Sequence, residues 1–123
     1  MFDDVIAFVP TTDPARAREF YAGTLGLDLV DENQFALVFR LGATMLRVTT
    51  VESFSPQPFT VLGWRVPDVE EAIRALTARG VTFERFDRME QDALGVWTSP
   101  VGGRIAWFRD PDGNTLSLAE LTA

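Results

Sequence analysis

The stretch RDPDGNTLSLAEL, residues 109–121, contains a turn followed by an alternating strand. Its segment 110–114 carries a proline and a glycine, which are residue types that build tight turns. In the strand that follows, Leu116 and Leu118 share one face, and the small hydroxyl residue Ser117 lies at the centre of the other. The apolar face predicts packing against a helix. The second face raises the question of what the strand presents there.

The first half of the chain predicts one strand, one helix and then three strands. Residues 5–9 are typical of a buried strand, and Asp13 is expected to cap a helix that ends at Gly26. The three strands expected after this helix are 27–30, 35–39 and 44–51.

The second half repeats this pattern after a linker at 53–59 that contains two prolines. Asp68 and Glu71 form the sequence pattern of a helix capping box, and Gly80 marks the helix end. The strands expected here are 60–66 before the helix and 81–86, 94–99, 104–108 and 115–121 after it.

Two halves with the same element order predict an α+β fold of two βαβββ modules. We expect a single domain over 1–123, with modules at about 1–52 and 59–123. The sheets should curve into a cup with the helices outside, and the second faces of the strands should line it. The residues expected to pack against the helices are Ala7, Val9, Leu46, Val48, Leu62, Trp64, Val66, Leu116 and Leu118.

Composition limits the classes of function. The chain of 123 residues has no cysteine and no histidine, so it offers no disulfide and lacks the commonest transition-metal ligand. A net charge of −7 argues against a nucleic-acid surface and is weakly compatible with cationic ligands. There is no signal-peptide pattern and no apolar run long enough to span a membrane, which predicts a cytoplasmic protein without a membrane partner.

Three segments carry a family resemblance: TTDPARAREFYAGTLGL at 11–27, VPDVEEAIRALTARGV at 66–81 and WFRDPDGNTLSL at 107–118. Together they resemble the vicinal oxygen chelate superfamily, which includes glyoxalase I, extradiol dioxygenases and bleomycin-resistance proteins. The resemblance covers nearly the whole chain. It implies the cup-shaped fold and, because members are often homodimers, a homodimer.

In metal-using members of that superfamily, four ligands project into the cup. The resemblance places these positions at Ile6, Arg47, Val61 and Ser117. Isoleucine and valine have no donor atoms for a metal, arginine offers only N–H donors and a positive charge, and a lone serine hydroxyl is a poor ligand. The sequence therefore predicts no metal site and no cofactor.

Strand alternation predicts a small-molecule site in the cup instead. Trp107 either stacks on a planar ligand or belongs to the core, and Arg47 needs either a carboxylate partner in the protein or an anionic ligand. Residues 90–92 are either a lip over the site or a solvated loop. The residues expected to contact the ligand are Phe8, Met45, Arg47, Thr49, Gly63, Trp107 and Ser117.

Three functions fit these patterns. The first is metal-independent binding of a small organic molecule, as in sequestration or drug resistance. The second is a lyase, isomerase or dioxygenase that acts on a small organic substrate. The third is a structural or partner-binding role in which side chains fill the cup. The missing metal ligands favour the first.

Overall fold

The computed structural model describes residues 1–122, and the chain divides into two compact units. Unit 1 comprises residues 1–56 and 110–114, and unit 2 comprises 57–109 and the chain from 115 onward. The turn at 110–114 therefore belongs to the first unit, although the strands on either side of it belong to the second. No helix in residues 1–122 is long and apolar enough to cross a membrane.

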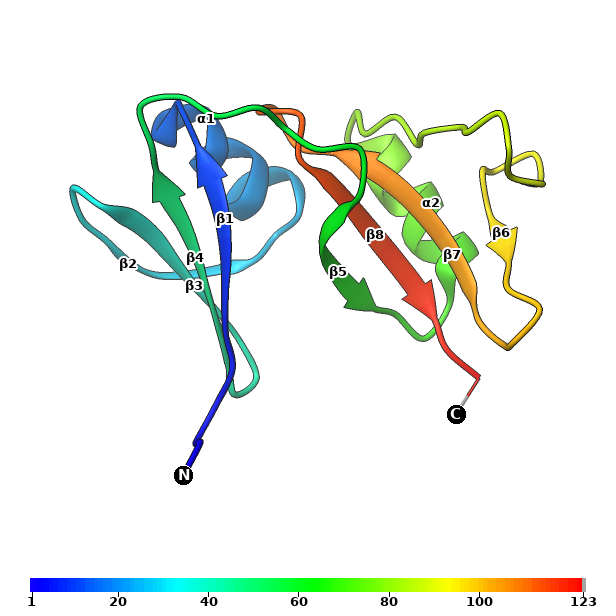
Figure 1. Ribbon diagram of the computed structural model, residues 1–123, viewed down its shortest axis with the longest axis horizontal. Helices are drawn as coiled ribbons and strands as arrows, with labels where there is room; N and C mark the ends of the chain where they lie inside the picture. The colour runs from blue at the N-terminus through cyan, green and yellow to red at the C-terminus, as the bar shows by residue number, and fades with distance from the viewer. Residues whose placement is uncertain (123) are drawn as a thin grey trace. The chain divides into compact units, whose positions relative to one another are not determined.

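Unit 1 contains a four-stranded mixed sheet, called sheet A here, with one helical segment (Figure 1). The strand order is β1-β4-β3-β2, and β1 runs parallel to β4 while the other pairs are antiparallel. The elements are β1 (Ile6–Thr11), α1 (Pro14–Arg18), η1 (Glu19–Thr24), β2 (Asp28–Glu32), β3 (Ala36–Leu41) and β4 (Thr44–Thr50).

Unit 2 repeats this topology in sheet B, with the order β5-β8-β7-β6 and the single parallel pair β5 and β8. Its elements are β5 (Thr60–Arg65), α2 (Val69–Ala78), β6 (Trp97–Thr98), β7 (Arg104–Arg109) and β8 (Thr115–Glu120). The predicted α+β class with two βαβββ halves is thus confirmed. The cup that would join both sheets stays a prediction.

Each sheet buries its helix-facing side and leaves the opposite side partly exposed. Helix α1 contacts β3 and β4, and α2 contacts β7 and β8. On the helix-facing side, Val9, Val48 and Leu116 are 0% exposed, as the alternation predicts. On the opposite side, called the open face here, Ile6 and Phe8 of β1 remain 49% and 60% exposed. Burial of the first set is the hydrophobic contribution that holds each helix on its sheet.

The predicted helix starts are confirmed. The Asp13 side chain accepts from the backbone N–H of Arg16, and the Asp68 side chain accepts from that of Glu71. Each carboxylate satisfies a donor that has no partner inside its helix.

The first helix differs from expectation because it widens into a π-helix after Arg18. The N–H of Leu25 bonds the carbonyl of Phe20, five residues back, where an α-helix would use four. Tyr21 in this widened turn is fully buried and packs against Phe39, with ring centroids 6.0 Å apart.

The strand predicted at 81–86 is wrong, and the strand predicted at 94–99 shrinks to two residues. Only an isolated bridge from Phe83 to Phe108 remains of the former. The reason lies in side chains that take over the backbone hydrogen bonds of this region. Gln91 accepts from the N–H of Phe86 and donates to the carbonyls of Glu84 and Gly95, so a strand ladder is not needed to satisfy these groups.

Candidate functional site

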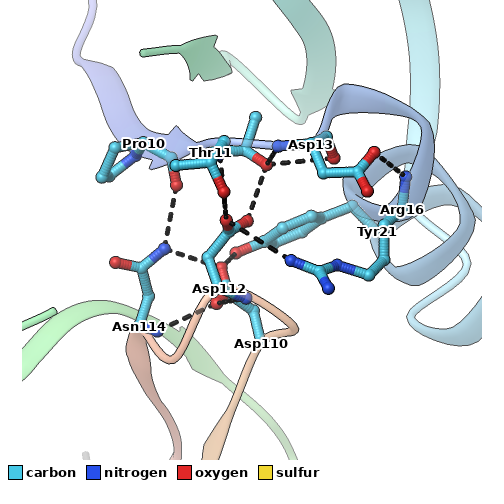
Figure 2. A network of polar contacts seen from close by, with 9 residues as sticks. Pro10, Thr11, Asp13, Arg16, Tyr21, Asp110, Asp112 and Asn114 are labelled. Carbon is cyan, nitrogen blue, oxygen red and sulfur yellow. Dashed lines mark hydrogen bonds and ion pairs between the residues drawn. The ribbon is translucent and has the colours of Figure 1, made fainter. Parts of the chain in front are cut away.

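The turn at 110–114 is organised around the buried carboxylate of Asp110 (Figure 2). One oxygen accepts from the N–H groups of Asp112 and Asn114, at 3.0 and 2.9 Å. The other accepts from the Asn114 amide at 2.8 Å and from the Tyr21 hydroxyl at 2.7 Å. Burial, followed by the neighbouring Asp110 charge, raises the pKa of Tyr21. The phenol therefore acts as a fixed donor within unit 1.

Asp112 anchors the same turn to the end of β1. Its carboxylate accepts from the Thr11 hydroxyl at 2.6 Å and from the N–H and hydroxyl of Thr12 at 2.9 and 2.8 Å. An ion pair to Arg16 at 3.8 Å adds to these bonds. Burial alone would raise the pKa of Asp112, but the hydrogen bonds from Thr11 and Thr12 outweigh it and the pKa is lowered. The turn is thus structural, and it fixes where β8 begins.

The open face of sheet B has Gly63, Ser117 and Trp107 side by side in register on β5, β8 and β7. The indole Nε1 of Trp107 donates to the hydroxyl of Thr60 at 2.9 Å. Because β8 lies between β7 and β5, and strands are about 4.8 Å apart, the indole reaches across the full width of β8. Gly63, Ser117 and Trp107 therefore form one row across the open face, and the indole ring of Trp107 lies over β8.

The small residues beneath this indole answer the question raised by Ser117. Ser117 is 9% exposed, and a Cβ added at Gly63 would lie 2.4 Å from its hydroxyl oxygen. The Ser117 hydroxyl thus occupies the space that a side chain at Gly63 would need. Ser117 and Gly63 act through their small size.

Two further aromatic rings surround Trp107. Trp97, whose register the sequence left open, pairs with Ile105 on the same face, and its ring centroid is 6.2 Å from that of Trp107. Phe86 approaches the indole edge to face at 5.6 Å. All three rings are half-buried. We call Phe86, Trp97 and Trp107 the aromatic platform.

Residues 90–92 lie beside this platform but are not a loose lip. Asp92 accepts from the N–H groups of Leu94 and Val96, and Gln91 holds the loop as described above. A shallow depression of about 340 Å³ is lined by Glu90, Gln91, Asp92, Val96, Trp97 and Thr98.

The open face of sheet A carries different side chains from that of sheet B. Phe8, Arg47 and Val38 lie in register on β1, β4 and β3. Met45 and Thr49 lie on the same face as Arg47, at the neighbouring positions of β4, and both are half-buried. The predicted contact residues of this half, Phe8, Met45, Arg47 and Thr49, therefore share one face of one sheet.

Arg47 has no protein partner in the described part of the chain. It is half-buried, and its guanidinium forms no ion pair, hydrogen bond or ring contact within residues 1–122. The ion pair considered from the sequence is therefore not formed. The buried hydroxyl oxygen of Thr49, two positions along, also lacks a hydrogen-bond partner.

Comparison with known proteins identifies the family. The model of the Glyoxalase/Bleomycin resistance protein/Dioxygenase superfamily matches residues 4–118. The chain belongs to this superfamily. No curated protein matches it.

Solved structures of the superfamily are similar over nearly the whole chain. A member from Sphaerobacter thermophilus is 27% identical, with 98% of each chain covered and a TM-score of 0.75. TnmS3, an antibiotic-binding protein from a Streptomyces species, is 27% identical, with 99% of this chain and 98% of that chain covered and a TM-score of 0.75. Lactoylglutathione lyase from Agrobacterium tumefaciens is 18% identical, with coverage of 94% and 90% and a TM-score of 0.72. At that identity the lyase indicates the shared fold alone.

The donor chemistry of this superfamily member does not fit the metal that other members use. Of the four implied positions, Ile6 and Val61 carry hydrocarbon side chains, Arg47 carries a cation, and Ser117 is packed against Gly63. Residues 1–122 also contain no cluster of three or more histidine, cysteine, aspartate or glutamate side chains able to hold a metal ion. No step of chemistry is therefore assigned to a metal here.

Proposed function

We propose that this protein binds a small organic molecule with a planar apolar part and does so without a metal ion. One observation carries the proposal: the indole of Trp107 lies across β8 on the open face of sheet B, above the small residues Ser117 and Gly63. A half-buried aromatic surface of this kind favours stacking on flat ligands. An antibiotic-binding relative that is 27% identical supports a binding role.

The sequence-predicted contact residues enter this proposal with different roles. Trp107 provides the stacking surface, and Gly63 and Ser117 make room for it. Phe8, Met45, Arg47 and Thr49 lie together on the open face of sheet A in unit 1 and stay predicted ligand contacts of that face. A homodimer and a cytoplasmic location are part of the proposal on the superfamily resemblance and the composition, and size-exclusion chromatography with light scattering tests the former.

Calorimetric titration with the neutral planar probe 2-naphthamide tests the proposal. We expect the wild-type protein to bind the probe and Trp107→Ala to weaken binding about tenfold or more, because base-sized aromatic stacking contributes about 1–3 kcal/mol. Trp64→Phe is the matched control, because Trp64 lies on the helix-facing side of the same sheet and stacks on Phe108. It should leave binding unchanged.

The enzyme alternative predicts a different result. Metal analysis of freshly purified protein would give a stoichiometric divalent metal, and a hemithioacetal or catechol substrate would turn over. Such turnover, or probe binding that Trp107→Ala leaves intact, would overturn the proposal. The structure offers no donor set that favours this outcome among its described residues.

A further inference from the structure

The open face of sheet A combines exposed apolar side chains with an unpaired cation. Ile6 and Phe8 on β1 are 49% and 60% exposed. Arg47 lies directly beside Phe8 on β4, is half-buried, and has no partner for its guanidinium within residues 1–122. We call Ile6, Phe8, Arg47 and Thr49 the Arg47 face.

No carboxylate of sheet A is placed to neutralise Arg47. The nearest acid by register is Asp31 of β2, which pairs with Val38 of β3, and Val38 in turn pairs with Arg47. Asp31 is thus two strands away, which is about 9–10 Å at the usual strand spacing. That separation is between backbones, and no acid of residues 1–122 forms an ion pair with Arg47. Arg47 as a whole is half-buried, but no nitrogen of its guanidinium is buried without a partner, so the charged group keeps access to solvent and to a ligand.

A second polar group on this face also lacks a partner. The hydroxyl oxygen of Thr49 is buried without a hydrogen bond. Buried hydroxyls nearly always have a partner, and each exception calls for a physical explanation. This oxygen has no accessible surface, so it is not a ligand contact, and Arg47 is the polar group of this face that a molecule with acceptor oxygens can reach.

We infer that the Arg47 face binds the acidic group of an organic anion, such as a carboxylate, while the apolar part of that anion lies against Ile6 and Phe8. Arginine suits this role because its planar fork of N–H donors matches two acceptor oxygens at once. The inference rests on the proposed function, since it names the chemical class of ligand. It also opposes what the net charge of −7 alone would suggest, which is a cationic guest.

The test uses three probes with one ring system: 2-naphthoate, 2-naphthamide and 2-naphthylmethylammonium. We expect calorimetry to show that 2-naphthoate binds roughly 10- to 100-fold more tightly than 2-naphthamide, because hydrogen bonds to a charged partner are worth about 1.5–3 kcal/mol. The ammonium probe should bind most weakly. Raising the salt concentration should reduce the advantage of the anion.

Variants assign the effect to one residue. Arg47→Met should remove the preference for 2-naphthoate over 2-naphthamide, and Arg47→Gln serves as a second variant should the first be unstable. Arg40→Met is the matched control, because Arg40 lies on the same face at an exposed position of β3 and should have little effect.

The outcomes separate this inference from the proposed function. Equal affinity for all three probes, or a preference for the anion that survives both Arg47 variants, would overturn the inference and leave the proposed function standing. A preference that depends on Arg47 together with 2-naphthamide binding that ignores Trp107→Ala would support the inference and overturn the proposed aromatic platform. Failure of all three probes would overturn both.

Discussion

The two sheets have the same strand order, but the large side chains of the central row lie on different strands in each. In sheet B the central row reads Gly63, Ser117 and Trp107, and in sheet A the corresponding row reads Phe8, Arg47 and Val38. Phe8 and Gly63 occupy matching positions, each five residues before its helix cap.

This difference changes what each open face can do. In sheet B the large residue is on the third strand and reaches over Ser117, which is 9% exposed, to Thr60 of the edge strand, while Gly63 stays exposed. In sheet A the third strand carries Val38, which is buried, and the edge and central strands carry the exposed Phe8 and the half-buried Arg47. One scaffold thus presents a flat aromatic surface in one unit and a cation beside apolar groups in the other.

The largest expected loss of stability comes from disrupting the turn at 110–114, which precedes β8 and the central row of sheet B. Asp110→Ala removes the acceptor of the buried Tyr21 hydroxyl and one of the two acceptors of the Asn114 amide, which keeps the Pro10 carbonyl. We expect a loss of about 2–4 kcal/mol in the free energy of unfolding, measured by urea denaturation. Asp28→Ala, at an exposed position of β2, is the control and should change stability by less than about 0.5 kcal/mol. Equal midpoints for both variants would contradict the assigned role of the turn.

Gly63→Ala tests whether the position beside Ser117 in sheet B requires a residue without a side chain. The new Cβ would collide with the Ser117 hydroxyl oxygen, which must leave its rotamer, so we expect a loss of about 0.5–1.5 kcal/mol in unfolding free energy. Adding Ser117→Ala should recover most of this loss, because the oxygen that clashes is then absent. A double-mutant cycle measures the coupling.

Gly23→Ala is the matched control for that cycle, because nothing lies within 4 Å of its added Cβ. Because Gly23 lies in a helix, this substitution should leave the free energy of unfolding unchanged or raise it slightly. If Gly63→Ala behaved in the same way, close packing beneath Trp107 would no longer explain the glycine.

Asp112→Asn tests the contribution of the turn to sheet A, because the Asp112 carboxylate is hydrogen-bonded to the end of β1. The pKa of Asp112 is lowered in the folded protein, so its carboxylate stabilises the fold above the unfolded-state pKa of about 3.9. This contribution is lost as the pH falls through the folded-state pKa. We expect the variant to be about 1 kcal/mol less stable at pH 7, with the difference shrinking below about pH 4. Urea midpoints from pH 7 to pH 3 check this, and a difference that grew towards low pH would contradict the sign.

Thr49→Val should have the smallest effect. The hydroxyl oxygen of Thr49 has no partner to lose, so stability should stay within about 0.5 kcal/mol of wild type or rise slightly. Thr11→Val is the contrast, because the Thr11 hydroxyl donates to Asp112 and accepts from the N–H of Asp13. It should cost about 1–2 kcal/mol. Thermal melts compare the two, and a large loss for Thr49→Val would mean that its hydroxyl has a partner after all.

Local patterns in the sequence were enough to predict most elements of the fold. The caps Asp13 and Asp68 are confirmed because a side chain three residues from its N–H partner needs no distant contact. The buried faces are confirmed because alternation along a strand is a local property. The strand predicted at 81–86 failed because Gln91 supplied the hydrogen bonds that a neighbouring strand would have made.

The candidate site was predictable only in part. Phe8, Arg47, Trp107 and Ser117 could be assigned to one face of their strands, but no local pattern indicates that Trp107 bonds Thr60 across an intervening strand. The bond from Tyr21 to Asp110 was missed for the same reason, since it joins residues 89 positions apart.

The amino-acid sequence by itself determined the repeat of two βαβββ halves and the helix starts, because these depend on residue type and short spacing, and the superfamily resemblance implied four positions that lack metal-donor side chains. Only the tertiary structure decided that Trp107 covers Ser117 and that Arg47 stays without a protein partner. Both facts depend on strand register, which brings residues from distant parts of the chain within a few ångströms of one another.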